Sequence, residues 1–240
     1  MKLGIMQPYF FPYLGYYDLI NRTDRWVVFD VVKYAPRSWT NRNRILHPTK
    51  GWQYISVPVE RQTSGRLIKD TVTLDAPAAG RRILGQIDHY RQRRAPFFQA
   101  VSGLVEDCFG GLESDRLRDL NVRSLSRVCT YLDIPLDLLI LSEIGLDLPE
   151  IDHPGGWAVE ISAALGATDY VNLPNGRGLF DPAEFAARGV SLRFTHLIDF
   201  KYSCRPYAFV DHLSIVDVLM WNSPEVVKAF LDARKSALAP

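Results

Sequence analysis

The opening segment, residues 1–34, constrains the fold most, because it sets two apolar runs around a loop of aromatic residues and prolines. Residues 3–6 have the length of a buried strand, and the Gln7-Pro8 pair ends it, since proline has no amide hydrogen to donate to a sheet. Residues 13–20 favour a short helix, and residues 25–32 are β-branched and aromatic, which predicts a second buried strand. This order predicts parallel pairing, with the loop at the carboxyl end of the first strand, where ligands bind in open sheets.

The remainder of the chain continues this pattern around a block of helices. Apolar residues recur at helical spacing in three segments between residues 78 and 134, and Ser114 is expected to cap the third helix. Residues 136–144 are continuously apolar, which is typical of a central strand, and a turn is expected at Ser64-Gly65. Other strands are expected at 52–59, 71–74, 169–173 and 191–196, and other helices at 157–165, 181–188, 213–221 and 224–238. We therefore predict a single α/β domain over residues 1–240, with a mostly parallel sheet, flanking helices and a helical insertion at about 78–134.

Charge and composition exclude several classes of partner. Lys and Arg number 28 against 27 Asp and Glu, so a net charge of +1 gives no global attraction to nucleic acid or to an anionic membrane. No apolar stretch reaches the roughly 18 residues of a membrane-spanning helix. The three cysteines are far apart and form no CxxC pair, which favours a reducing cytoplasm over a disulfide framework.

The histidines and cysteines predict no metal site. None of the five histidines has the HxxxH or HExxH spacing of a zinc site. Cys108 and Cys129 lie on apolar helix faces and are expected to be inert. Cys204 lies in an irregular polar stretch between His196 and His212, so a thiol mechanism there stays open.

Four consecutive residues, Asn41 to Arg44, combine two amides with two guanidinium groups. In an extended backbone Arg42 and Arg44 share one face, and Asn41 and Asn43 share the other. Two guanidinium groups that converge suit a phosphate or carboxylate. We expect an anionic ligand here, the alternative being a solvated turn with surface ion pairs.

Polar and aromatic side chains in two other segments extend the predicted site. Asn172 and Asn175 follow the strand expected at 169–173, which places them at the same carboxyl edge as the first loop. The side chains in the opening segment pair an apolar body with a polar end, which suits a sugar, nucleotide or pantetheine-like ligand. They are Gln7, Tyr9, Tyr13 and Tyr16. The alternative is that these aromatic residues only fill the end of the sheet, as Phe10 and Phe11 are expected to do.

Six strings of the sequence resemble, in the same order, the WbqC-like family of bacterial proteins. The strings are IMQPYFFPYLGYYDLI, FDVVKYAPRSWTNRNRI, WQYISVPV, APFF, LGATDYVN and LSIVDVLMWNSPEVV, and they span nearly the whole chain. The resemblance implies an acyl or aminoacyl (glycine-type) transferase of O-antigen or specialised-metabolite biosynthesis, with a sugar or small amine as acceptor. It implies no cofactor beyond an activated donor, such as a thioester on coenzyme A or on an acyl carrier protein. The family has two adjacent acids where this chain has Asp30-Val31, which argues against a metal held by an acid pair.

Asp30 is expected to be buried, because it lies within an otherwise apolar run. An unpaired buried carboxylate costs several kcal/mol, so Asp30 needs a partner. Either Arg42 or Arg44 neutralises it, or Asp30 acts as a general base at the end of its strand. In acyl transfer to an amine, Asp30 would then accept the proton while Asn41 or Asn43 donates to the developing oxyanion.

Two other classes of function remain open. A strand, an aromatic loop with Gly15, a helix and an aspartate-bearing strand also suit a nucleotidyltransferase, although the paired histidines of that class are missing around Gly15. A non-enzymatic module that binds a small molecule or a carrier protein is the third possibility. Release of pyrophosphate, of free thiol or of neither would separate the three.

Overall fold

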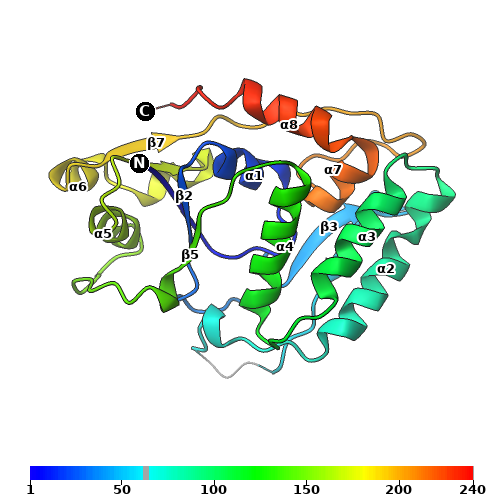
Figure 1. Ribbon diagram of the computed structural model, residues 1–240, viewed down its shortest axis with the longest axis horizontal. Coiled ribbons are helices and arrows are strands. Elements are labelled where there is room, and N and C mark those ends of the chain that lie inside the picture. The colour runs from blue at the N-terminus through cyan, green and yellow to red at the C-terminus, as the bar shows by residue number, and fades with distance from the viewer. Residues whose placement is uncertain (62–64, 240) are drawn as a thin grey trace.

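The computed structural model describes residues 1–61 and 65–239, which contain a five-stranded sheet in the left half of Figure 1. The strands are β1 (Lys2–Met6), β2 (Arg25–Val28), β5 (Leu138–Ile140), β6 (Asp169–Asn172) and β7 (Ser191–Phe194). They lie in the order β5-β2-β1-β6-β7, and every neighbouring pair is parallel. The predicted α/β class with a mostly parallel sheet is therefore confirmed.

Helices lie on both sides of this sheet. In Figure 1, α5 and α6 lie to the left of the strands, α1 and α4 to their right, and α2 and α3 farther out. The helices beside the sheet include α1 (Leu14–Asn21), α5 (Gly156–Ala164) and α6 (Pro182–Ala187). Helix α8 (Pro224–Ala233) packs on α1, and α7 (Ile215–Trp221) packs on the helical block. The helical block consists of α2 (Ala76–Gln92), α3 (Phe98–Phe109) and α4 (Leu117–Tyr131). Within the described residues, no helix is both long and apolar enough to cross a membrane.

A separate hairpin pairs two strands next to the helical block. Strands β3 (Arg42–Leu46) and β4 (Trp52–Ser56) are antiparallel, and β4 contacts α2 while β3 contacts α7. Short 3-10 helices follow at η1 (Ile68–Asp70), η2 (Leu141–Glu143) and η3 (Pro174–Leu179). The hairpin brings the Asn41 to Arg44 segment beside the loop that follows β1, because the Phe10 amide donates to the Trp39 carbonyl at 2.8 Å.

The alternation of side chains along the strands divides the core into two apolar clusters. Leu3 and Val27 face the cluster on the α5 side, whereas Trp26 and Val28 face the cluster that includes the helical block. Position 4 of β1 requires glycine, because a Cβ there would lie 2.7 Å from the ring of Trp26 on the neighbouring strand β2. The sheet is thus buried on both faces, as its continuous apolar strands predict.

The strand order creates one place where the chain changes direction across the sheet. From β1 the chain moves to β2 and then to β5 on one side, and it later returns to β6 and β7 on the other. The connections that leave the carboxyl ends of β1 and β6 therefore diverge, which opens a crevice between those two ends.

Several predicted elements differ from the observed ones. The run 136–144 is not a central strand, since it contributes only the edge strand β5 and the turn of η2. Its sequence is continuously apolar because side chains on both of its faces pack against the two apolar clusters described above. The expected strand 71–74 makes only isolated bridges through Val72 and Thr73. Ser114 is not the N-cap of α4, which is Arg116; its hydroxyl accepts from the Arg116 amide at 3.1 Å.

Two elements end earlier than predicted. Strand β2 stops at Val28, so Asp30 lies in the loop after it rather than within the strand. The last helix ends at Ala233, after which the chain turns back and Ala239 bridges to Phe194. The turn expected at Ser64-Gly65 lies partly outside the described residues.

Candidate functional site

A cavity of about 530 Å³ lies at the carboxyl edge of the sheet, where the strand order predicts a crevice. Its walls come from the loop after β1, the hairpin β3-β4 and its approach, and the segments after β6 and β7. Aromatic side chains form much of the wall, namely Tyr9, Tyr13, Phe29, Trp39, Trp157, Tyr170 and Phe180. A cavity of this size and character is typical of a site for a small molecule.

The loop after β1 is held from outside by side-chain donors. The Tyr16 hydroxyl donates to the Gln7 carbonyl, and the Asn121 amide of α4 donates to the Pro8 carbonyl at 2.8 Å. The same Asn121 amide donates to the Thr40 carbonyl at 2.7 Å, so one side chain joins the two loops that wall the cavity. Tyr16 was predicted to contact ligand, but it is fully buried and holds the loop instead.

A second clamp fixes the turn of this loop. Phe11 has a φ of +39°, in the sparsely populated left-handed region. The Asn43 amide donates to the Phe10 and Phe11 carbonyls at 3.1 and 2.8 Å, and the Ser214 hydroxyl donates to the Phe11 carbonyl at 2.7 Å. Phe10 and Phe11 are completely buried, as predicted. Asn43 lies at the cavity wall, but its amide nitrogen is used to shape the wall.

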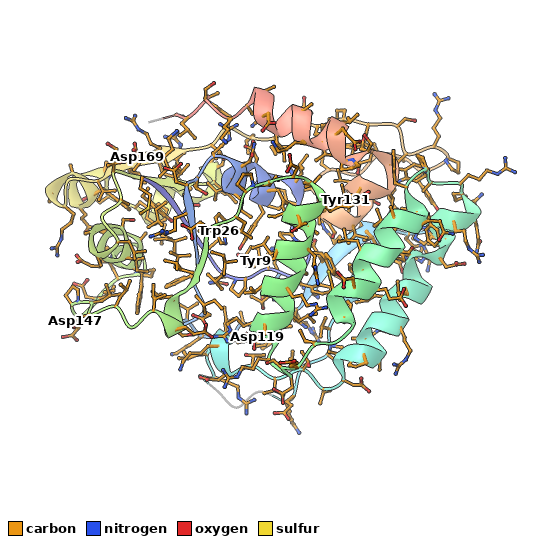
Figure 2. The ribbon with its side chains drawn as sticks, viewed as in Figure 1. Tyr9, Trp26, Asp119, Tyr131, Asp147 and Asp169 are labelled. Carbon is orange, nitrogen blue, oxygen red and sulfur yellow. The ribbon has the colours of Figure 1, made fainter. Side chains whose placement is uncertain are left out.

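Gln7, Tyr9 and Tyr13 line the cavity, in agreement with the predicted position of the first loop at the carboxyl end of its strand. Figure 2 shows Tyr9 near the centre of the molecule, in the region between the sheet and the helical block. Burial raises the pKa of the Tyr9 hydroxyl and raises the pKa of Tyr13 to about 12. Both phenols therefore stay protonated at neutral pH and are available as hydrogen-bond donors.

The two arginines of β3 have different surroundings, although they share one face of the strand. Arg44 lines the cavity with its guanidinium carbon 5.6 Å from the Trp39 ring centroid and 5.2 Å from that of Trp52. Arg42 instead stacks over Tyr54 at 4.0 Å, outside the cavity. No described carboxylate forms an ion pair with Arg44, so its charge is available to an anionic ligand.

Asn172 and Asn175 lie at the end of β6 and line the cavity, beside the first loop, where the sequence predicts them. The Asn172 side chain is engaged within the wall, because its amide donates to the Tyr170 hydroxyl at 2.5 Å and its oxygen accepts from the Leu173 amide at 2.6 Å. Asn175 is exposed at the mouth.

Asp30 does not line the cavity, and the expectation that Arg42 or Arg44 neutralises it is wrong. Its carboxylate is completely buried and pairs with Arg118 of α4 at 3.1 Å. It also accepts from the Ser142 hydroxyl at 2.6 Å and from the Ser142 amide at 3.1 Å. This set of partners ties the end of β2 to α4 and η2, which explains the buried carboxylate as a structural group.

Asn41 also lies away from the cavity. Its amide donates to the Val57 carbonyl at 3.1 Å, which closes the base of the hairpin. The three residues expected to act as base and oxyanion donors are therefore not brought together. Asp30 and Asn41 lie elsewhere, and Asn43 alone reaches the wall.

Two histidines that the sequence predicted only as partners of Cys204 line the cavity instead. His196 follows β7 and His212 precedes α7. Cys204 is buried, its thiol lies near the Tyr207 carbonyl at 3.6 Å, and burial raises the pKa of that thiol, which disfavours the reactive thiolate. Among the described residues that line the cavity there is no carboxylate, so the imidazoles are the bases it offers.

Comparison with known proteins gives one family and one curated relative. The model of the WbqC-like protein family matches residues 7–229. An uncharacterized protein of Mycobacterium tuberculosis, Rv1507c, is 30% identical over 189 residues, which cover 77% of each chain. No solved structure matches the chain significantly.

Proposed function

The chain belongs to the WbqC-like protein family, and from this premise we propose that it is an acyl or aminoacyl transferase. It takes an activated acyl group, such as glycyl, from a thioester and transfers it to a sugar or small amine in O-antigen or specialised-metabolite biosynthesis. The donor is a thioester on coenzyme A or on an acyl carrier protein, and both substrates meet in the cavity at the carboxyl edge of the sheet.

The composition of the cavity wall carries this proposal. The wall combines aromatic side chains with the unpaired charge of Arg44, and its described residues include no carboxylate. Such a wall favours a ligand with a flat or apolar part and an anionic group, and it disfavours a cationic ligand. A phosphopantetheine thioester has both parts, because its arm is weakly polar and its phosphate is anionic.

Product analysis tests the reaction class. We expect the purified protein to release free thiol from glycyl- or acyl-coenzyme A when an amine or amino sugar is present, with a stoichiometric amide or ester product detected by mass spectrometry. Incubation with ATP and the free acid in place of the thioester is the matched arm. Thioester consumption that equals the rate without protein would contradict the proposal.

The strand order gives specific support to a second candidate, nucleotidyl transfer. In chain order the sheet reads third, second, first, fourth and fifth parallel strand, which is the order of doubly wound sheets that bind nucleotides at the switch point. Pyrophosphate release from ATP in the same assay would favour this candidate. Saturable ligand binding with release of neither thiol nor pyrophosphate would instead favour a binding module.

The neighbouring arginines of β3 provide a matched test of where the anion binds. Arg44→Gln removes the charge in the cavity, whereas Arg42→Gln removes the same charge two residues away, over Tyr54 and outside the cavity. Because a charge-assisted hydrogen bond contributes about 1.5–3 kcal/mol, we expect Arg44→Gln to weaken binding of acyl-coenzyme A by roughly 10- to 100-fold, measured by calorimetric titration. Equal losses in the two variants would show that the anion does not bind at Arg44.

A further inference from the structure

His212 adopts a backbone conformation that the surrounding structure enforces. Its φ is +56°, in the left-handed region that only a few per cent of non-glycine residues adopt, most often asparagine, aspartate and histidine. The Arg44 guanidinium donates to the His212 carbonyl at 3.4 Å, and the next residues are bound to the cavity wall. The Ser214 amide donates to the Arg44 carbonyl at 2.8 Å and the Ile215 amide to the Pro12 carbonyl at 2.9 Å. Enforced conformations of this kind concentrate at functional sites.

The imidazole of His212 is oriented but has no hydrogen-bond partner. It packs edge-on against the Tyr13 ring, with the centroids 5.6 Å apart and the planes at 87°. It lines the cavity, and its ring nitrogens bond to no described residue. His196 also lines the cavity, yet no described aromatic ring fixes the orientation of its side chain.

The groups around His212 leave its ring free to exchange a proton with a ligand. Arg44 is bonded to its carbonyl, and the neighbouring Asp211 is paired with Lys201 at 2.7 Å rather than with the imidazole. The Tyr13 hydroxyl stays protonated, because burial raises the pKa of Tyr13 to about 12. Because the imidazole lines the cavity and no described residue bonds to its ring nitrogens, it is placed to accept a proton from a group that attacks within the cavity.

We propose that His212 is the catalytic base of the transfer, an inference that rests on the proposed function. The nitrogen of the acceptor amine attacks the thioester carbonyl carbon, so that a C–N bond forms and the amine proton passes to a ring nitrogen of His212. The C–S bond then breaks, and its electron pair leaves with the thiolate. The imidazolium returns the proton to the thiolate, which gives an amide, a free thiol and a neutral histidine.

Substitutions chosen for the backbone conformation test this role. His212→Asn removes the titratable ring, and His212→Gly removes the whole side chain; both residues tolerate a positive φ. We expect each to lower kcat for thiol release by about 100-fold or more, with unchanged affinity for acyl-coenzyme A by calorimetric titration. Added imidazole should restore activity to His212→Gly in a saturable manner, because the vacated space accepts the missing base. His47→Gln, which replaces a histidine that does not line the cavity, is the control and should retain most of its kcat.

Each outcome decides the question. Rescue of His212→Gly by imidazole, together with a slow His212→Asn variant of wild-type melting temperature, supports the base role, which a purely structural residue would not show. If His212→Gly does not fold, a large kcat loss in folded His212→Asn supports the role. A wild-type kcat in His212→Asn, or no rescue of a folded His212→Gly, overturns it while the proposed function stands. A wild-type protein that consumes no thioester overturns both.

Discussion

Asp217 illustrates how one buried residue makes stability depend on pH. This carboxyl of α7 is completely buried, and it accepts hydrogen bonds from the Tyr90 hydroxyl, from the Tyr202 hydroxyl at 2.7 Å and from the Leu46 amide at 3.2 Å. Burial raises the pKa of Asp217 even though these donors act to lower it. The native state therefore favours the protonated carboxyl more than the unfolded chain does. Its contribution to stability is complete below the unfolded pKa and is lost as pH rises through the native pKa.

The substitution Asp217→Asn should remove this pH dependence. The amide retains an acceptor oxygen for Tyr90 and Leu46, and its nitrogen can donate to Tyr202 after that hydroxyl rotates. We expect the stability of Asp217→Asn relative to wild type to be smallest near pH 4 and to increase toward pH 8, by about 1.4 kcal/mol for each unit by which the native pKa is raised. Urea unfolding over this pH range measures the difference. Parallel stability curves for the two proteins would contradict the raised pKa.

Among the helices and strands, the spacing of apolar residues predicted those features that depend only on neighbouring residues. The strand, loop, helix and strand of the opening segment were predicted correctly because each has its own pattern of apolar residues and Pro8 marks the end of the first strand. The run 136–144 was assigned to the centre of the sheet because an apolar run shows that a strand is covered, not how many neighbours it has. Strand order depends on crossovers that no short window of sequence contains.

The same limit explains which parts of the candidate site were predicted. Gln7 and Tyr9 were predicted because their loop directly follows a strand, which places it at the carboxyl edge, and Arg44 was predicted from the two neighbouring guanidinium groups. The partner of Asp30 lies 88 residues away in α4, and no spacing rule links the two. His212 was considered only as a possible partner of Cys204, because the turn that brings it to the cavity depends on contacts with β3 and the first loop.

Asn121 carries a prediction about how α4 supports the cavity. Asn121→Ala leaves the Pro8 and Thr40 carbonyls buried without this donor, which costs about 1–3 kcal/mol for each unsatisfied group. We expect lower stability in urea unfolding and faster hydrogen exchange at the Phe10 amide, which joins the two loops. Ser124→Ala is the matched control, because that hydroxyl is equally buried in α4 but bonds only within the helix. Equal exchange rates at Phe10 in both variants would show that Asn121 does not hold the loops.

The first and the last helix of the described chain pack against each other. Figure 1 shows the N- and C-terminal ends near each other, with α8 along the same edge as α1. The contact includes charges, since Asp18 of α1 pairs with Arg22 at 3.1 Å and with Arg234 at 3.3 Å. Arg22 also donates to the Ala237 carbonyl at 2.5 Å, so a helix from the start of the chain fixes the segment after its last helix.

A substitution of Arg22 tests whether the buried ion pair stabilises this contact between α1 and the end of the chain. Asp18 and Arg22 are almost completely buried, so Arg22→Met leaves a buried carboxylate without one of its two cationic partners. Breaking a buried pair in this way costs about 3–5 kcal/mol, and we expect that loss in urea unfolding. The double variant Asp18→Asn/Arg22→Met should lose less than the sum of its single variants, because it removes both charges together. Arg91→Met breaks the exposed Arg91–Asp88 pair of α2 and should change stability little. If Arg22→Met lost as little stability as Arg91→Met, the contact between α1 and α8 would not depend on the buried ion pair. Apolar packing between the two helices would then have to hold them together.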